Sequence, residues 1–499
     1  MLELIEKQQR QIVDLTSQLE ASLSQNAKLR FQLDQFIRAV HGTKSEKLHL
    51  LTPSPSATSP ELPFGEELKQ ENVQEIKSIT VTRTLGKKEN PPSRNELPEH
   101  LDRVITTLEP KSIPDGAVKI GELVTEQLEY QPGKLFVQKT IRPKYALADK
   151  SGVVVAPMPL ISTYKCMAGA SLLMRILVDK YVDHLPLYRQ QQRLKRDGMN
   201  IPASTLSGWV KLAAELLEPL YDLLVEQVLA SSYIGADETH MNVLDKKLKG
   251  KTHHGYFWVY LAHQEKLIFF DYDASRAQGV PGEKLKNFKG HLQSDGYVGY
   301  KQFKNNPDIT WMCCWAHARR KFEAAMKNDL KRSEFVLEKI QRLYRLEHWM
   351  RVFKVSPEKT VQLRQKMATP ILEELKAWML QTIVDPKVLP SSPIADAIKY
   401  TLKLWEELTV YTTDHKLHID NNPVENKIRP VAIGRKNFLF MGSHQHAQYS
   451  AMLYSFFASC ALNGVNPEQW LQDVIEKIST TPIEERHTLL PNRWSPSKN

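Results

Sequence analysis

Apolar residues recur every seven positions through the first forty residues of the chain. The repeat consists of Ile5, Ile12, Leu19, Asn26, Leu33 and Val40, and four of these are followed three residues later by Leu15, Ser22, Leu29 and Phe36. Such an a/d seam predicts a coiled-coil helix over residues 1–50, in which the polar Asn26 would fix the register of a parallel dimer. The e and g positions carry Gln more often than paired charges, and Leu23 and Ile37 widen the apolar stripe. A helix that packs on its own protein is therefore the alternative to dimerisation.

Two segments of different composition follow. Residues 51–98 are polar and include TPSPSATSPELP, whose prolines and serines cannot build a core, so we expect a linker. Residues 99–165 then contain the short β-type runs QLEY, KLFVQKTI and GVVVAP, separated by Pro-Gly and Asp-Lys-Ser-Gly turns. This alternation predicts a small β-subdomain.

Residues 166–230 carry the periodicity of helices. AGASLLMRILVDKYVDHL is followed by PLYRQQQRLKRDG, by a short turn at 199–201 and by PASTLSGWVKLAAELLEPL. Gly198 is placed to end one helix, and Pro202 or Ser204 to begin the next. Two helices joined by so short a turn are typical of a helix-turn-helix, with a plain helical hairpin as the alternative.

A sheet is predicted over residues 231–325. We expect YIGADET, HHGYFWVYLA and KLIFFDYD to form three consecutive strands, with Asp237 at the end of the first. HLQSDGYVGY predicts a fourth strand that ends at Asp295, and ITWMCCWAHARRKF predicts a fifth that passes into a helix. Three antiparallel strands followed by strands that alternate with helices is the order of the ribonuclease H-like fold.

The rest of the chain is predicted to interrupt and then complete this domain. Apolar residues at helical spacing indicate helices over 326–410, which would form an insertion. Residues 411–470 would then be the second part of the ribonuclease H-like core, and 471–499 a tail. The whole is thus expected to be an α/β multidomain protein. In IDNNPVENK, Asn422 is a plausible N-cap with Pro423 at the first helical position. Glu425 could then be no more than the carboxylate of a capping box.

Composition limits the class of protein. A length of 499 residues suggests about three domains, and 41% hydrophobic with 25% charged residues excludes a wholly disordered or fibrous chain. No run of about 18 apolar residues occurs, so we expect no membrane span. The four scattered cysteines do not suggest a disulfide framework, and the N-terminus lacks the apolar core of a secretory signal. We therefore expect a cytoplasmic protein.

The net charge of +10 is concentrated in one region. Residues 134–212 contain 13 Lys and Arg against four Asp and no Glu, which gives this segment a charge of +9. Such asymmetry favours a polyanion as partner, because phosphate contacts release counterions, although a solvated basic surface is the alternative. The candidates for DNA contact within it are Arg193, Lys195, Arg196, Ser204, Thr205, Ser207 and Lys211. We add Arg435 and Lys436, expected in a turn after the helix that carries Glu425, as candidate phosphate contacts.

Three carboxylates on separate elements are candidates for a metal site. Asp237, Asp295 and Glu425 could converge at one end of the sheet, and their hard oxygen ligands suit Mg²⁺. Two such ions about 4 Å apart can activate the attacking oxygen and stabilise the leaving one at a phosphodiester. Spacing alone is weak evidence for this, since an Asp at the end of a strand is more often a turn residue.

Other polar residues near these strands are expected to be structural. Asp271 and Asp273 favour turn or supporting roles, and Asp420 could orient a ligand or cap a helix. His240, His317 and Cys314 could suggest a site for a softer metal. Because the adjacent Cys313 and Cys314 would point to opposite faces of a strand, we expect core packing instead.

At these residues the chain resembles the transposases of the insertion sequence 66 family of bacterial mobile elements. The likeness is carried by GADETHMNV, LQSDGYVGY, CCWAHARRKF and above all IDNNPVENKIRPVAIGRKNFLFMGS. Further blocks are similar upstream, namely KSEKL, TEQLEY, RPKYA, KYVDHLPLYRQ and STLSGWV, and LLPNRW is similar near the C-terminus. The resemblance covers nearly the whole chain in the same order.

This resemblance implies a DDE-type DNA transposase with a ribonuclease H-like catalytic domain. Asp237, Asp295 and Glu425 would be its metal-binding triad and would hold Mg²⁺ or Mn²⁺, two ions per active site. Water would attack the DNA at the end of the element, and the freed 3′-hydroxyl would then attack target DNA. The N-terminal region would bind the terminal inverted repeats, and two small proteins of the same element would be possible helpers.

The chain departs from the family in one respect. Members often carry two Cys pairs around the block that corresponds to TEQLEY and form a zinc ribbon, which needs four thiolate or imidazole ligands. Here KSIPDGAVKIGE has no Cys, and Leu147 and Lys150 stand where the second pair would fall. We therefore expect a zinc-ribbon-like β-subdomain without structural zinc.

Two other functions fit part of the sequence. A DNA-binding regulator or an inactive relic would need the basic region and the heptads but not the acidic triad. A nuclease of the same fold would cut DNA without joining it. We expect the transposase, acting in the bacterial cytoplasm at the nucleoid.

Overall fold

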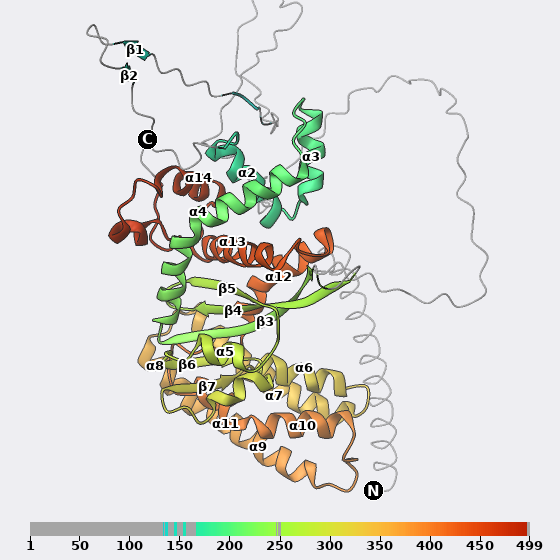
Figure 1. Cartoon of the computed structure of the whole chain (residues 1–499). Coiled ribbons are helices and arrows are strands. Elements are labelled where there is room, and N and C mark those ends of the chain that lie inside the picture. The colour runs from blue at the N-terminus through green and yellow to red at the C-terminus, as the bar shows by residue number, and fades with distance from the viewer. Residues whose placement is uncertain are drawn as a thin grey trace, which may run out of the picture. The chain divides into compact units, whose positions relative to one another are not determined.

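The computed structural model describes residues 133, 135–137, 144–146, 153–155, 166–245, 247 and 251–496 (Figure 1). The predicted coiled coil and linker lie outside these residues, as does most of the predicted β-subdomain. Within that subdomain, β1 (Lys144–Ala146) and β2 (Val153–Val155) form an antiparallel pair. No helix in the described part of the chain is both long enough and apolar enough to cross a membrane.

A mixed sheet of five strands forms the centre of the fold. Its order is β5-β4-β3-β6-β7. The first three strands along the chain are antiparallel to one another, whereas β6 and β7 run parallel to β3. The strands are β3 (Tyr233–Leu244), β4 (Thr252–Ala262), β5 (Leu267–Asp273), β6 (Gly290–Ser294) and β7 (Ile309–Cys313). The sequence predicted each of these five strands.

The first strand is longer than the sequence suggested. Asp237 is an interior residue of β3 and pairs with Val259 of β4, so the expectation that the strand ends at Asp237 was wrong. The strand continues through polar residues because β4 pairs with it as far as Leu244, and Leu244 also donates its backbone N–H to the carbonyl oxygen of Met441.

Serine hydroxyl groups of a buried helix accept hydrogen bonds from the backbone N–H groups of β5, the strand at one edge of the sheet. Helix α13 (His444–Asn463) packs along this strand (Figure 1). The backbone N–H of Ile268 donates to Ser459 Oγ at 3.1 Å, and that of Phe270 donates to Ser455 Oγ at 2.8 Å. Because an edge strand otherwise leaves N–H groups unpaired, these serines allow β5 to be buried.

Within the described part of the chain, three helices precede the sheet, as the sequence predicted for residues 166–230. They are α2 (Ala170–Tyr181), α3 (Leu187–Arg196) and α4 (Ala203–Leu229). Gly198, between the last two, has a φ of 85°, a conformation that few other residues adopt at the end of a helix. The three helices contact one another, and α4 runs on beside the sheet, where Tyr221 donates to the carbonyl oxygen of Phe270 at 2.6 Å.

A group of helices lies on the β7 side of the sheet (Figure 1). The prediction of helices over 326–410 is confirmed, and α5 (Gly279–Lys284) precedes β6. The group consists of α6 (Trp315–Ala325), α7 (Leu330–Val352), α8 (Pro357–Leu363), a π-helical turn (Arg364–Ala368), α9 (Thr369–Ile383), α10 (Pro393–Lys403) and α11 (Trp405–Thr409). The chain then returns to the sheet in α12 (Asn422–Phe438) and continues through α13 and α14 (Pro467–Lys477) to a 3₁₀ helix (Ile483–Leu489).

A buried arginine joins these helices to the segment that leads into α12. Arg364 is 3% exposed and forms two hydrogen bonds with Glu347 of α7, at 2.9 and 2.7 Å. Its remaining N–H groups donate to the carbonyl oxygens of Tyr411, Asp414 and Leu417 at 2.6 to 3.0 Å. The carbonyls of this return segment thus obtain partners that no regular secondary structure supplies.

We predict that Arg364→Met destabilises the protein by about 3 kcal/mol or more, because it leaves the half-buried Glu347 charged and unpaired and three carbonyl oxygens without their donor. Unfolding by urea, followed by circular dichroism, measures this loss. Arg319→Met is the matched control, since Arg319 forms an exposed ion pair with Glu323 and its loss should cost about 1 kcal/mol or less. Equal stabilities of the two variants would contradict the role given to Arg364.

Candidate active site

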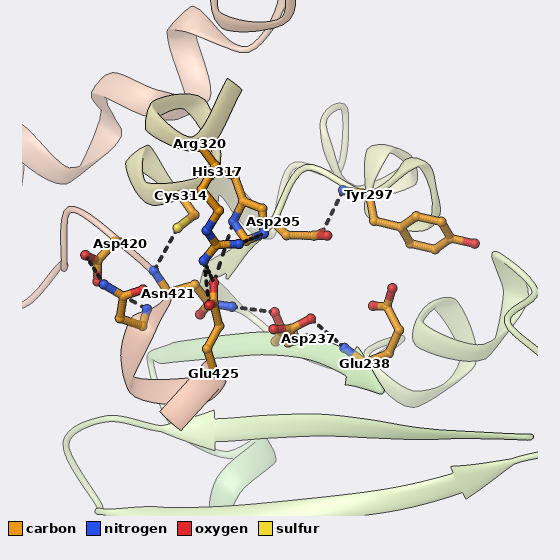
Figure 2. Close-up of polar contacts among 12 residues, drawn as sticks. Asp237, Glu238, Asp295, Tyr297, Cys314, His317, Arg320, Asp420, Asn421 and Glu425 are labelled. Carbon is orange, nitrogen blue, oxygen red and sulfur yellow. Dashed lines mark hydrogen bonds and ion pairs between the residues drawn. The ribbon is translucent and has the colours of Figure 1, made fainter. Parts of the chain in front are cut away.

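Three acidic side chains from distant parts of the sequence face one region beside β3 (Figure 2). Asp237 is on β3, Asp295 directly follows β6, and Glu425 lies in the first turn of α12. Strand β6 pairs with β3 through Gly235 and Gln293, and α12 packs against β3. The fold therefore brings together the three acids that the sequence singled out.

Asn421 holds the start of α12 against the sheet. This fully buried residue donates from Nδ2 to the carbonyl oxygen of Ala236 at 2.9 Å. Its backbone N–H donates to Sγ of Cys314 at 3.1 Å, at the junction of β7 and α6. Asn421, four positions before Glu425, is thus hydrogen-bonded both to Ala236, which precedes Asp237, and to Cys314, which precedes α6.

The helix begins differently from the prediction. Its N-cap is Asn421 and not Asn422, and the side chain of Asn421 makes no capping hydrogen bond. Asp420 instead accepts a hydrogen bond from the backbone N–H of Asn422 at 3.1 Å and another from its side chain at 2.7 Å. Because the backbone N–H groups of Asn421 and Asn422 already have acceptors, Glu425 is not the carboxylate of a capping box.

Negative charge is concentrated around Asp237. Burial raises the pKa of its carboxyl well above the ordinary value, and the charges of Asp295, Glu238 and Glu425 raise this pKa further. Burial also raises the pKa of Glu238, although the hydrogen bond from Arg276 at 2.9 Å opposes that rise. The charges that act most strongly on the carboxyl of Asp237 are therefore negative. Such a group of negative charges attracts a cation.

The loop after β6 fixes Asp295. Its Oδ1 accepts from the backbone N–H of Tyr297 at 2.8 Å, and its carbonyl oxygen accepts from the hydroxyl of Tyr400 at 2.9 Å. Gly296 has a φ of 86°, and a Cβ there would lie 2.9 Å from Leu404. Since Tyr400 is on α10, the helices between β7 and α12 contribute directly to the position of this acid.

Arg320 of α6 binds the third acid. Its Nη2 donates to both carboxylate oxygens of Glu425, at 2.7 and 2.6 Å, and its Nη1 lies 3.0 Å from Nε2 of His317. Among the described residues, Cys314, His317 and Glu425 are also the one group of potential ligands whose donor atoms all lie within 4.8 Å of one another. Burial raises the pKa of the Cys314 thiol to about 12, and burial together with Arg320 lowers the pKa of His317.

Sequence reasoning missed several of these residues. Cys313 and Cys314 are buried, as expected for core packing, but Cys314 follows β7 and precedes α6 instead of lying within a strand. His317 faces the acids, which the sequence did not predict. The signal available in the sequence was that His317 lies three residues before Arg320 on a helix directly after a strand, a spacing that makes the two side chains neighbours.

The candidates for DNA contact on α3 and α4 are placed in two ways. Lys195, Arg196, Ser204 and Lys211 are exposed, and Thr205 is half-buried. Arg193 instead pairs with the buried Asp179, and Ser207 lies 2.9 Å from Nε2 of His446. The structure therefore gives Arg193 and Ser207 partners within the protein.

Arg435 and Lys436 lie in the last turn of α12, and the expectation of a turn at this point was wrong. The helix continues because Arg435 is anchored on β3, where its Nη1 donates to Oγ1 of Thr239 at 2.8 Å and to the carbonyl oxygen of His240. Lys436 is exposed.

The chemistry of the acids fits a divalent cation. Asp237, Asp295 and Glu425 offer oxygen donors only, which Mg²⁺ and Mn²⁺ prefer. Glu425 already forms an ion pair with the guanidinium of Arg320. A metal bound there would have to replace at least one of the two contacts that Arg320 makes with this carboxylate.

Three family models match the chain. The model described as Transposase IS66 family matches residues 165–449, and the IS66 C-terminal element matches residues 455–492. A third, described as Transposase C of IS166 homeodomain, matches residues 28–105 and indicates a homeodomain-like N-terminal region. That match includes the segment 51–98, for which the composition predicts a linker.

Three curated proteins of Sinorhizobium fredii (strain NBRC 101917 / NGR234) are similar along nearly their whole length. The uncharacterized protein y4jD is 32% identical over 93% of this chain and 94% of its own. The uncharacterized proteins y4hP and y4qI are 29% and 31% identical and cover 93% and 92% of this chain, and 88% and 87% of their own. No solved structure matches the chain.

We predict that Asp237→Asn raises the thermal midpoint of the metal-free protein at pH 7. Because folding raises the pKa of this carboxyl, its contribution to stability is present below the ordinary pKa of 3.8 and is lost as the pH rises through the raised value. The gain from Asn should therefore be absent near pH 3.5 and grow with pH, reaching about 2 °C or more. Differential scanning fluorimetry across this pH range measures it.

We also expect added Mn²⁺ to stabilise the wild type, and the same substitution to remove this effect, since an oxygen donor is lost. Asp308→Asn, at an exposed acid 3.6 Å from Lys289, is the control and should change neither quantity. A variant Asp237→Asn that melts below the wild type at every pH would contradict the repulsion described here.

Proposed function

Because the chain belongs to the IS66 transposase family, we propose that it is a DDE-type DNA transposase that cuts the ends of a mobile element and joins them to target DNA. The observation that carries the proposal is the convergence of Asp237, Asp295 and Glu425 from three elements onto one region (Figure 2). A protein that only bound DNA would have no need to bury like charges together, which costs stability.

The order of the strands supports a ribonuclease H-like catalytic domain. Three antiparallel strands are followed by two that run parallel to β3, with helices between them. In this assignment residues 231–325 and 411–470 form the catalytic domain, and residues 326–410 form a helical insertion. Residues 166–230 would be a basic, helix-turn-helix-like region, and 471–499 a C-terminal tail.

In the proposed reaction the three acids would hold two Mg²⁺ or Mn²⁺ ions. When bound, such ions activate the attacking oxygen and stabilise the leaving oxygen of an in-line displacement at phosphorus. The chain's own part is to fix the acids: Asn421 positions α12 and hence Glu425, while Tyr297 and Tyr400 position Asp295. Water first displaces the 3′-oxygen at the end of the element, and that 3′-hydroxyl then displaces an oxygen of the target strand.

Exposed basic residues support binding to the terminal inverted repeats and to target DNA. We assign this role to Lys195, Arg196 and Lys211, together with Ser204 and Thr205 on the first turn of α4. Lys436 would contact phosphate, and Arg435 would position α12 against β3. Arg193 and Ser207 would act by supporting this surface, since each has a partner inside the protein.

The proposal extends to partners and location. The heptads of residues 1–50 would join two chains, small proteins of the same element could assist, and the site of action would be the bacterial cytoplasm at the nucleoid. The β-subdomain would fold without zinc, because the sequence has no Cys before Cys166. One zinc ion per chain after extensive dialysis would contradict this last point.

We predict that Asp295→Ala lowers strand cleavage and strand transfer by more than about 100-fold, since the loss of even a residue that only supports a metal ligand costs 10–100-fold. Binding to end DNA should be nearly unchanged. Gel assays with labelled inverted-repeat DNA and Mn²⁺ measure the products, and mobility shift measures binding. The control is the variant Asp271→Ala, which should stay active. Asp271 lies on β5, and its carboxylate is 2.6 Å from Nζ of Lys284 on α5.

Full activity of Asp295→Ala would rule out the metal role. If the wild type binds end DNA but never nicks it, a DNA-binding regulator or an inactive relic is the better description. Cuts without joined products would indicate a nuclease.

A further inference from the structure

His317 presents a hydrogen-bond donor that has no acceptor in the protein. Its Nδ1 is buried and, among the described residues, has no hydrogen-bond partner. The nearest carboxylate oxygen, Oε1 of Glu425, lies 3.8 Å away, which is too long for a hydrogen bond. A buried polar nitrogen without a hydrogen-bond partner costs stability. Its presence beside the acids therefore points to a ligand atom that accepts its hydrogen bond.

The contact with Arg320 decides which ring nitrogen of His317 carries the proton. Nη1 of Arg320 lies 3.0 Å from Nε2. A guanidinium has only N–H donors and stays protonated, so Nε2 must accept this hydrogen bond. In the neutral ring the proton is then on Nδ1, which makes Nδ1–H the donor that faces Glu425.

Arg320 can keep this contact when Glu425 binds something else. It uses Nη2 for both oxygens of Glu425 and Nη1 for His317, so the two contacts involve different nitrogens. The backbone of His317 is also fixed, because its N–H donates to the carbonyl oxygen of Cys314 at 3.2 Å in the first turn of α6. The donor is therefore held in place by the protein and not by the absent acceptor (Figure 2).

We propose that His317 donates a hydrogen bond from Nδ1–H to a non-bridging oxygen of the phosphate group that is transferred, and that Arg320 is the positioning residue that fixes this tautomer. The inference rests on the proposed function. An anionic phosphate oxygen beside Glu425 is the acceptor that the location supplies, and a fixed neutral donor stabilises the charge that grows on such oxygens during displacement.

A metal held by Cys314, His317 and Glu425 explains the same residues less well. A metal needs the thiolate of a cysteine, but Sγ of Cys314 accepts the hydrogen bond from the backbone of Asn421 and is buried. A metal bound to Nδ1 of His317 would also require the proton to be on Nε2, where Nη1 of Arg320 already donates at 3.0 Å.

Three substitutions of His317 test the proposal in single-turnover cleavage of end DNA with Mn²⁺. In His317→Asn the amide nitrogen stands close to the position of Nδ1, whereas in His317→Gln it reaches toward that of Nε2. We expect Asn to keep the rate within about tenfold of the wild type, and Gln and Ala to lose about 10²–10³-fold, as when one oxyanion donor is removed. End binding should be unchanged in all three.

The outcomes separate the inference from the function on which it rests. If the wild type cuts no DNA, the proposed function fails. If the wild type cuts and His317→Ala cuts equally fast, or if Gln rescues the rate and Asn does not, the role of Nδ1 is refuted. A role confined to folding would slow Asn and Ala alike, and it would lower their thermal midpoints in parallel with their rates.

Phosphorothioate DNA provides a second measurement that does not depend on how well each variant folds. Sulfur at the contacted oxygen accepts hydrogen bonds poorly, so the rate ratio of oxygen to sulfur for one diastereomer should be larger for wild type and His317→Asn than for His317→Ala. Equal ratios in all three proteins, for both diastereomers, would overturn the contact.

Nitrogen NMR tests the tautomer without DNA or metal. In the full chain labelled with ¹⁵N-histidine, the signals missing from His317→Asn identify the ring of His317. We expect a protonated Nδ1 and an unprotonated Nε2 in the wild type, and a loss of this preference in Arg320→Gln. A proton on Nε2 in the wild type would refute the assignment.

Discussion

The hydrogen bonds of Asn421 are the constraint on which the rest of the site depends. Glu425 is separated from Asp295 by β7 and by the helices from α6 to α11, and it lies on a helix and not on a strand of the sheet. The buried amide of Asn421 binds the backbone of β3 beside Asp237, and its backbone binds the junction of β7 and α6. One residue thus aligns three elements, and Arg364 steadies the segment that precedes it by binding three of its carbonyl oxygens.

The helices between β7 and α12 are part of the site's support. Tyr400 of α10 binds the backbone of Asp295, and Arg320 and His317 of α6 reach Glu425. The acids therefore have fixed positions although their charges repel one another. The repulsion is tolerated because neutral hydrogen-bond donors and two arginines contact the carboxylates. Arg276 pairs with Glu238, and Arg320 pairs with Glu425.

The sequence predicted most of the fold because each element has a local pattern. Apolar and aromatic runs predicted all five strands, and helical spacing predicted the helices on either side of them. Residue types and family resemblance together identified Asp237, Asp295 and Glu425. The end of β3, the cap of α12 and the location of Arg435 were missed, because each depends on a partner far away in the sequence: β4, Cys314 and Thr239. The role proposed for His317 could not be predicted for the same reason, since nothing local shows that a guanidinium will contact one of its nitrogens.

The ion pair between Arg320 and Glu425 has a consequence for the newly synthesised protein. Because a side chain of the same polypeptide supplies the counter-charge, the third acid is neutralised as soon as α6 meets α12. Under the proposed function, the chain would therefore reach its native state without divalent ions and bind them afterwards. Folding and metal binding would then be separate steps, with the guanidinium of Arg320 beside Glu425 until the ions bind.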